Sequence, residues 1–159
     1  MNAPLRRLAF FSLVLFGLGA PSLHAQREKL PPDDLVIVEK KWPDAKRTYT
    51  GLRYIVLKPG KQDGRSPVPG NMVSVAYKGS LLNGTVFDQS AATAPLKIRM
   101  GRGELIPGWD EALQRMHVGE KWLLIVPPEL GFGTRGRLPS IPRSATLVFE
   151  MELLDFGND

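Results

Sequence analysis

The sequence of 159 residues contains no cysteine. This absence excludes disulfides, thiolate zinc sites, cysteine nucleophiles and lipid attachment through cysteine. Only two histidines are present, His24 and His117, so a catalytic triad or a histidine-ligated metal site is disfavoured. We expect neither a metal nor a cofactor. The chain is instead rich in glycine and proline, with 16 and 14 residues, which predicts many turns and loops.

The only long apolar run lies near the N-terminus, where the sequence has the layout of a secretory signal peptide. Arg6 and Arg7 precede an almost unbroken apolar run over residues 8–20, and small residues lead to a cleavage position after Ala25. A membrane anchor is the alternative, but the run is shorter than the ~20 residues that a spanning helix needs. We therefore expect a signal peptide over residues 1–25. Its removal would leave an exported protein, periplasmic or secreted, without a membrane span.

The formal net charge is +5, and its distribution argues against nucleic-acid binding. Two basic residues leave with the signal peptide, and the remaining basic excess lies in residues 26–65. Residues 66–159 are close to neutral. A nucleic-acid-binding domain needs a basic face on its folded unit, so we expect no nucleic-acid partner.

The remaining chain divides into an arm and a main domain. Residues 26–65 are predicted to form the N-terminal arm and first strand, with the strand in the run LRYIVL at residues 52–57. Residues 26–32 are polar and bounded by proline, which predicts a loose tether. Residues 66–159 form the main domain.

A short helix is predicted within the arm, over residues 34–41. Asp33 is a suitable N-cap and Pro43 ends the pattern. The β-branched residues of this segment leave a strand as the alternative.

Alternation of apolar and polar residues predicts the strands of the main domain. Val73, Val75 and Tyr77, for example, share one face of their strand. Asn83-Gly84 predicts a hairpin with a type I′ turn, which needs positive φ at both central residues. Strands are expected over residues 72–82, 85–88, 96–100, 121–126 and 145–153.

One amphipathic helix is predicted after Pro107-Gly108, with Gly119 as its end. Together the elements predict an α+β domain in which one short helix covers a face of an antiparallel sheet of about five strands. The residues on the apolar side of the helix are Trp109, Ala112, Leu113 and Met116.

The chain offers little conventional catalytic chemistry. Asp110 and Glu111 are neighbours on the predicted helix and do not face each other. The glycine-rich segments 101–103 and 131–136 have no Walker lysine.

Aromatic and apolar residues are instead concentrated around one acid, Asp88. Packing in the core explains most of them, but Phe132 lies between two glycines and Ile106 precedes a proline. Both lie in predicted loops, where binding residues often occur.

Several ordered motifs resemble the FKBP-type peptidyl-prolyl isomerases. The resemblance covers roughly residues 66–156 almost without gaps, which makes it far more specific than one short motif. The matching segments are VAYKG at 75–79, LNGTVFD at 82–88, GRGELIPGW at 101–109, MHVGE at 116–120, PPELGFG at 127–133, IP at 141–142 and ATLVFE at 145–150.

This resemblance implies a twisted antiparallel sheet wrapped around a short helix, with an apolar pocket between them. Trp109 would be the pocket floor, Asp88 its polar rim, and the Ile106 N–H would hold a substrate carbonyl. The catalytic residues implied are Tyr77, Phe87, Asp88, Ile106, Trp109, Phe132 and Phe149, and the further substrate-binding residues are Leu96, Leu105 and Ile141.

Three departures from the family pattern affect this pocket. Phe132 stands where many members have tyrosine, and Leu96 replaces a common phenylalanine. Arg137 and Ser140 replace other loop residues. These differences bear on substrate preference and on affinity for macrolides more than on the fold.

The implied activity is cis–trans isomerisation of X-Pro bonds in exported proteins. An apolar pocket suits this reaction, since the twisted amide is less dipolar than the planar one. The expected partners are proline-containing polypeptide clients, with FKBP-binding macrolides as further ligands, and the protein is expected to be a monomer. The alternative is a chaperone or peptide-binding module of the same fold with little turnover.

Overall fold

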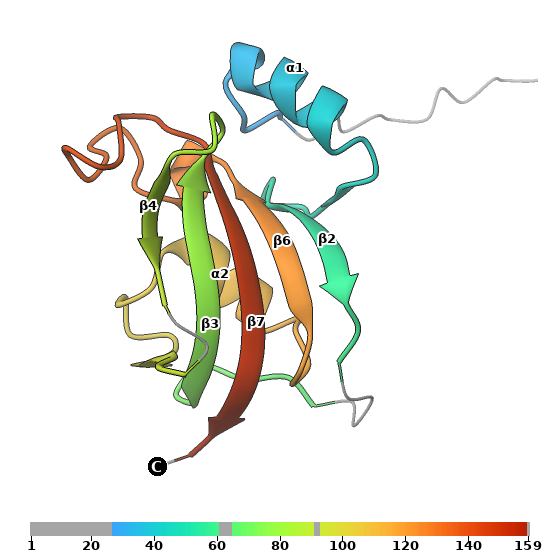
Figure 1. Cartoon of the computed structure of the whole chain (residues 1–159), viewed down its shortest axis with the longest axis vertical. Helices are drawn as coiled ribbons and strands as arrows, with labels where there is room; N and C mark the ends of the chain where they lie inside the picture. Colours follow the sequence, from blue (N-terminus) through green and yellow to red (C-terminus); the bar gives the residue numbers. More distant parts are fainter. Residues whose placement is uncertain (1–26, 61–64, 91–92, 159) are drawn as a thin grey trace, which may run out of the picture.

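The computed structural model describes residues 27–60, 65–90 and 93–158, so the predicted signal peptide lies outside the described residues. Two α-helices, one short 3-10 helix and seven strands follow one another along this part of the chain (Figure 1). They are α1 (Pro32–Lys41), β1 (Lys46–Arg47), β2 (Arg53–Lys58), β3 (Met72–Leu81), β4 (Val86–Gln89), β5 (Leu96–Arg99), α2 (Pro107–Leu113), β6 (Lys121–Val126), η1 (Pro128–Leu130) and β7 (Leu147–Gly157).

All seven strands belong to one antiparallel sheet in the order β1-β2-β6-β7-β3-β4. The short strand β5 pairs with the beginning of β3, on the edge that β4 occupies further along. The α+β class is confirmed, whereas the expected number of about five strands is too low. One reason is β1, whose two residues are too few to show an alternating pattern.

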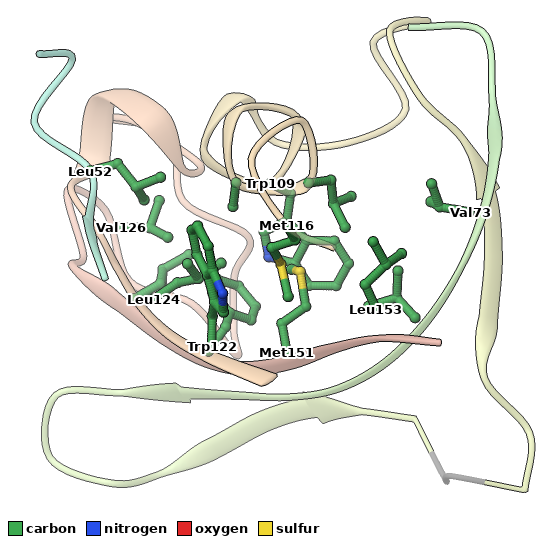
Figure 2. Close-up of a cluster of buried hydrophobic side chains, with 14 of the residues drawn as sticks. Leu52, Val73, Trp109, Met116, Trp122, Leu124, Val126, Met151 and Leu153 are labelled. Carbon is green, nitrogen blue, oxygen red and sulfur yellow. The ribbon is translucent and has the colours of Figure 1, made fainter. Parts of the chain in front are cut away.

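The main core lies between the sheet and α2. Alternate residues of β3, β6 and β7 point to this face, as their alternation predicts. Figure 2 shows Trp109 of α2 and Met116 of the following turn close to Met151 and Leu153 of β7. Residues of this cluster that have no exposed surface include Val73, Val75, Leu113, Leu124, Leu147 and Met151.

The helix α2 is shorter than the sequence predicts. It ends at Leu113, and Arg115 N–H then donates to the Ala112 carbonyl at 2.9 Å, which tightens the chain into a turn. Met116 is nevertheless fully buried in that turn. Gly119, with φ of 86°, lies beyond it and starts the approach to β6.

The hairpin between β3 and β4 also differs in detail. Gly84 has φ of 89°, but Asn83 is not among the residues with positive φ, so the turn is not type I′. Leu81 N–H donates to the Thr85 carbonyl, and Thr85 N–H donates to the Asn83 side-chain oxygen at 3.0 Å. The connection between β3 and β4 is therefore longer than a two-residue type I′ turn, and only Gly84 in it takes the left-handed conformation.

The helix α1 packs at one end of the opposite face of the sheet (Figure 1), and it confirms the helix predicted for the arm. Its N-cap is Pro31 and no side chain caps it, so the predicted Asp33 cap is wrong. Val38 is fully buried against Ile125 of β6, and Leu30 is 5% exposed in the same cluster. The tether predicted for residues 26–32 is therefore wrong for the residues described, since Leu30 has an apolar site to occupy. Neither described helix is long and apolar enough to cross a membrane.

Candidate active site

A cavity of about 200 Å³ opens where β3, β4 and β5 meet the segment before α2 and the loop between β6 and β7. Hollows of about 340, 230 and 690 Å³ also open on the described surface, but none of them is lined by more than one aromatic side chain. The smaller cavity is mostly apolar. It is lined by Tyr77, Phe87, Asp88, Leu96, Ile98, Glu104, Leu105, Ile106, Trp109, Phe132, Arg137 and Phe149.

Edge-to-face aromatic contacts build the floor and walls of this cavity. Trp109, in the first turn of α2, is 5% exposed. Its ring meets Tyr77 at a centroid distance of 4.8 Å and Phe149 at 5.2 Å, with interplanar angles of 78° and 82°. Phe87 meets Phe149 at 5.6 Å and 87°. Such arrangements are favoured by the ring quadrupoles, so each ring holds a neighbour in place and the cavity is shaped before any ligand binds.

The two phenylalanine walls stand over a residue that has no side chain. Gly79 of β3 pairs with Asp88 on one side and with Phe149 on the other. A Cβ atom at position 79 would lie 2.7 Å from the Phe87 ring and 2.8 Å from the Phe149 ring. Both distances are shorter than real carbon contacts, so any side chain there would displace a wall of the cavity.

The segment before α2 brings backbone groups to the cavity. Gly101 has φ of 72°, and its N–H donates to the Asp110 carboxylate at 3.2 Å, which ties the segment back to α2. Ile106 is extended, with φ of −64° and ψ of 146°, as the following proline favours. Its N–H has no hydrogen-bond acceptor within residues 27–60, 65–90 and 93–158. A donor without a partner therefore lies at the cavity wall.

The polar rim consists of a tyrosine, an acid and an arginine. Arg137 Nη1 lies 3.7 Å from Asp88 Oδ2, and the same guanidinium lies 6.0 Å from the centre of the Phe132 ring. Burial raises the pKa of Tyr77 to about 12, helped by the hydrogen bond and the negative charge of Asp88 and opposed by the charge of Arg137. The Tyr77 hydroxyl consequently keeps its proton throughout the neutral range.

Arg137 is positioned by the loop between β6 and β7. The N–H groups of Arg137 and Ile141 each donate to the other's carbonyl at 2.9 Å. Ile141 is 1% exposed and packs in the main core. The family resemblance implies that Ile141 belongs to the pocket wall. In the structure Ile141 does not line the cavity, because its side chain packs in the main core.

The other nine predicted site residues all line the cavity. Three more residues line it, of which the sequence marked Arg137 only as a departure from the family pattern and did not identify Ile98 or Glu104. Ile98 shares a face of β5 with Leu96, so strand periodicity carried a usable signal. Glu104 and Arg137 lie in irregular segments, where no periodicity predicts which side chains converge.

His117 lies away from the cavity. The backbone N–H of His117 donates to the Glu120 carboxylate at 3.0 Å, and neither residue lines the cavity. The described residues contain no cluster of three or more side chains that could hold a metal ion.

The arrangement defines a small preformed apolar cavity with a polar rim, of the kind that binds a peptide or a small ligand. Residues 63–154 match the family of FKBP-type peptidyl-prolyl cis-trans isomerases. The chain is 44% identical over 107 residues to FK506-binding protein 1 of Dictyostelium discoideum. The matched segment covers 67% of this chain and 98% of that protein. It is 46% identical over 109 residues to the FKBP-type 22 kDa peptidyl-prolyl cis-trans isomerase of Escherichia coli K12, covering 68% of this chain and 51% of that one.

A solved structure agrees with the fold. The crystal structure of a peptidyl-prolyl cis-trans isomerase from Pseudomonas syringae matches with a TM-score of 0.69 and 34% identity, over 79% of this chain and 92% of that one. The chain belongs to the FKBP-type peptidyl-prolyl cis-trans isomerases, and it is an enzyme of that class.

Proposed function

We propose that the 200 Å³ cavity is the place where this enzyme rotates X-Pro bonds. The barrier to that rotation, ~18–20 kcal/mol, comes from amide resonance. Resonance is lost in the twisted transition state, which is less dipolar than the planar amide. An apolar cavity that excludes water therefore stabilises the transition state more than the ground state. The observation that carries this proposal is the interlocked aromatic lining of Trp109, Phe149, Phe87 and Tyr77.

The lining residues have distinct roles in this proposal. The rings of Phe87 and Phe149 enclose the proline, and Trp109 forms the floor beneath it. The unpaired Ile106 N–H binds the carbonyl of the substrate and holds one side of the bond while the other turns. Asp88 orients the substrate electrostatically at the rim and transfers no proton. The remaining contact surface comes from Leu96, Leu105 and Phe132.

The clients are proposed to be proline-containing polypeptides outside the cytoplasm, because the N-terminal sequence resembles a secretory signal. One relative bears the name FK506-binding protein 1. We propose that macrolides of that class compete with peptide for the same cavity. Phe132 lacks a hydroxyl, so it offers such a ligand no hydrogen bond from this position.

The proposal is tested by prolyl-peptide kinetics on Phe87→Ala, with Val86→Ala as the matched control. Val86 is the preceding residue of β4, is 43% exposed and does not line the cavity. Opening the wall at Phe87 should lower kcat/KM ten-fold or more, or at least ~1.4 kcal/mol in barrier. Asp88→Asn keeps the shape and should cost less than Phe87→Ala.

Equal effects of Phe87→Ala and Val86→Ala, with the fold of both intact by circular dichroism, would contradict this location of the site. Wild-type protein that binds prolyl peptides without accelerating their isomerisation would favour the low-turnover binding module. Leu138, an apolar residue of the loop between β6 and β7 that is 64% exposed, is the feature that such a module would use.

Export is tested separately by mass spectrometry of the protein from its producing cells. The new N-terminus should be Gln26 or a residue within a few positions of it. A full-length product retained inside the cytoplasm would contradict export and would leave the proposal for the cavity untouched.

A further inference from the structure

The loop between β6 and β7 carries two residues of the cavity, Phe132 and Arg137, and hydrogen bonds within the loop hold it together. Gly136 N–H donates to the Phe132 carbonyl at 3.1 Å, and Ser144 N–H donates to the Gly133 carbonyl at 2.9 Å. Such internal hydrogen bonds fix the shape of the loop. Its position relative to the other walls depends on Ile141, buried below it, and on the two stems through which it joins the strands.

The arm contacts both stems of this loop. Lys29 Nζ lies 2.5 Å from the Glu129 carboxylate, in the stem that follows β6. Thr146 Oγ1 donates to Asp34 Oδ2 at 2.6 Å, in the stem that precedes β7. Figure 1 shows α1 and the loop at the same end of the sheet.

The two contacts differ in strength. Glu129 is 57% exposed, so water and salt screen its pairing with Lys29. Thr146 is only 2% exposed, and its hydroxyl would lose its acceptor if the arm moved away. The contact between Asp34 and Thr146 is thus the one with the larger consequence.

The arm is itself held to the sheet independently of the loop. Glu28 forms ion pairs with Arg53 at 2.9 Å and with Arg47 at 3.3 Å. Burial raises the pKa of Glu28, but hydrogen bonds from the backbone N–H groups of Leu30 and Lys29 and the nearby arginines outweigh it, so the pKa is lowered overall. The carboxylate is charged at neutral pH, and the arm is a fixed point against which the loop can be placed.

We propose that the arm is a positioning element for the active-site loop. Through Asp34 and Thr146, it sets the distance between Phe132 and Arg137 on one side of the cavity and Asp88 on the other. Release of the contact would let the loop drift outward and weaken the grip on substrate without removing any cavity residue. This inference rests on the proposed function of the cavity, and Asp34 and Thr146 act through the loop without touching substrate.

The test compares Thr146→Val, which removes the hydroxyl at nearly constant shape, with Thr146→Ser, which keeps it. Asp34→Ala removes the acceptor. Asp33→Ala is its matched control, since Asp33 lies in the same first turn of α1 and is exposed. The measurements are KM and kcat with prolyl peptides, and hydrogen exchange of the loop amides of Gly136, Ile141 and Ser144, all on the full chain.

Asp34→Ala and Thr146→Val should each raise KM about five-fold, the low end of couplings between separate sites, with kcat nearly unchanged and faster loop exchange. The double variant should be no worse than either single one, because both remove the same contact. Thr146→Ser and Asp33→Ala should match wild type. Lys29→Gln, a second variant on the other stem, should raise KM and loop exchange in the same direction by less.

The proposal is overturned if Asp34→Ala and Asp33→Ala behave alike in both measurements, or if the effects of Asp34→Ala and Thr146→Val add in full. Hydrogen exchange does not depend on turnover. A failure of the cavity assignment would therefore appear as unaltered kinetics in Phe87→Ala, while loop exchange would still decide whether the arm positions the loop.

Discussion

Among the described residues that line the cavity, the Tyr77 hydroxyl alone has a strongly shifted pKa, which burial and the neighbouring Asp88 raise. The folded-state pKa of Tyr77, about 12, lies above the ordinary value of 10. The stability linked to this proton is therefore complete below pH 10 and is lost only as the pH rises toward 12. Near neutrality the Tyr77 hydroxyl is therefore a neutral donor at the rim.

Activity should therefore be nearly flat between about pH 6 and 8. Tyr77 stays protonated in this window, and no histidine is among the residues that line the cavity. The measurement is kcat/KM for a prolyl peptide across that range, with folding checked at each pH. A bell-shaped profile, or loss of turnover in a folded His117→Ala variant, would instead indicate acid–base chemistry.

The sequence predicted which residues line the cavity more successfully on strands and helices than in irregular segments. Tyr77, Phe87 and Phe149 lie on strands whose alternation and family motifs agree with the cavity. Arg137 reaches Asp88 only because its loop folds back through the paired backbone of Arg137 and Ile141. That fold-back depends on contacts between distant parts of the chain, which a local pattern does not contain.

At the scale of elements, the arm is the part that composition alone misjudged. The sequence suggests a tether over residues 26–32, but Leu30 is buried in the cluster that Val38 of α1 forms with Ile125 of β6. A signal for this contact was present in β6, where residues 123–126 are all apolar and do not alternate. A run of that kind indicates a strand buried on both faces, and α1 is the element that covers the second face. The hairpin turn at Asn83-Gly84 was similarly located correctly but assigned the wrong turn type.

Val38→Ala should destabilise the protein by about 2 kcal/mol, since it removes two buried methyl groups and leaves a cavity beneath α1. Val36→Ala is the control on the same helix, because Val36 is 67% exposed. The check is the free energy of unfolding in urea for both variants. Equal stabilities would mean that α1 does not dock on the sheet in solution.

At the scale of the whole molecule, a helix packs on each face of the sheet, and the two faces have separate tasks. On one face α2 and the sheet enclose the main core, and the aromatic cavity is an extension of that core toward solvent. On the other face α1 packs near the ends of the loop that completes the cavity. The fold thus makes an apolar site from residues that also stabilise it, which explains how the chain supports catalysis with so few conventional catalytic groups.

The most direct test of the cavity as the isomerisation site is nuclear magnetic resonance of the full chain with a prolyl peptide. One experiment records the cis–trans exchange rate of the peptide together with the indole N–H signal of Trp109, which has no hydrogen-bond partner among the described residues. The account predicts accelerated exchange in the peptide and a shift of the Trp109 signal at the same peptide concentrations, with both lost in Phe87→Ala. Accelerated exchange that leaves the Trp109 signal unmoved, with shifts confined to residues outside the cavity, would contradict it.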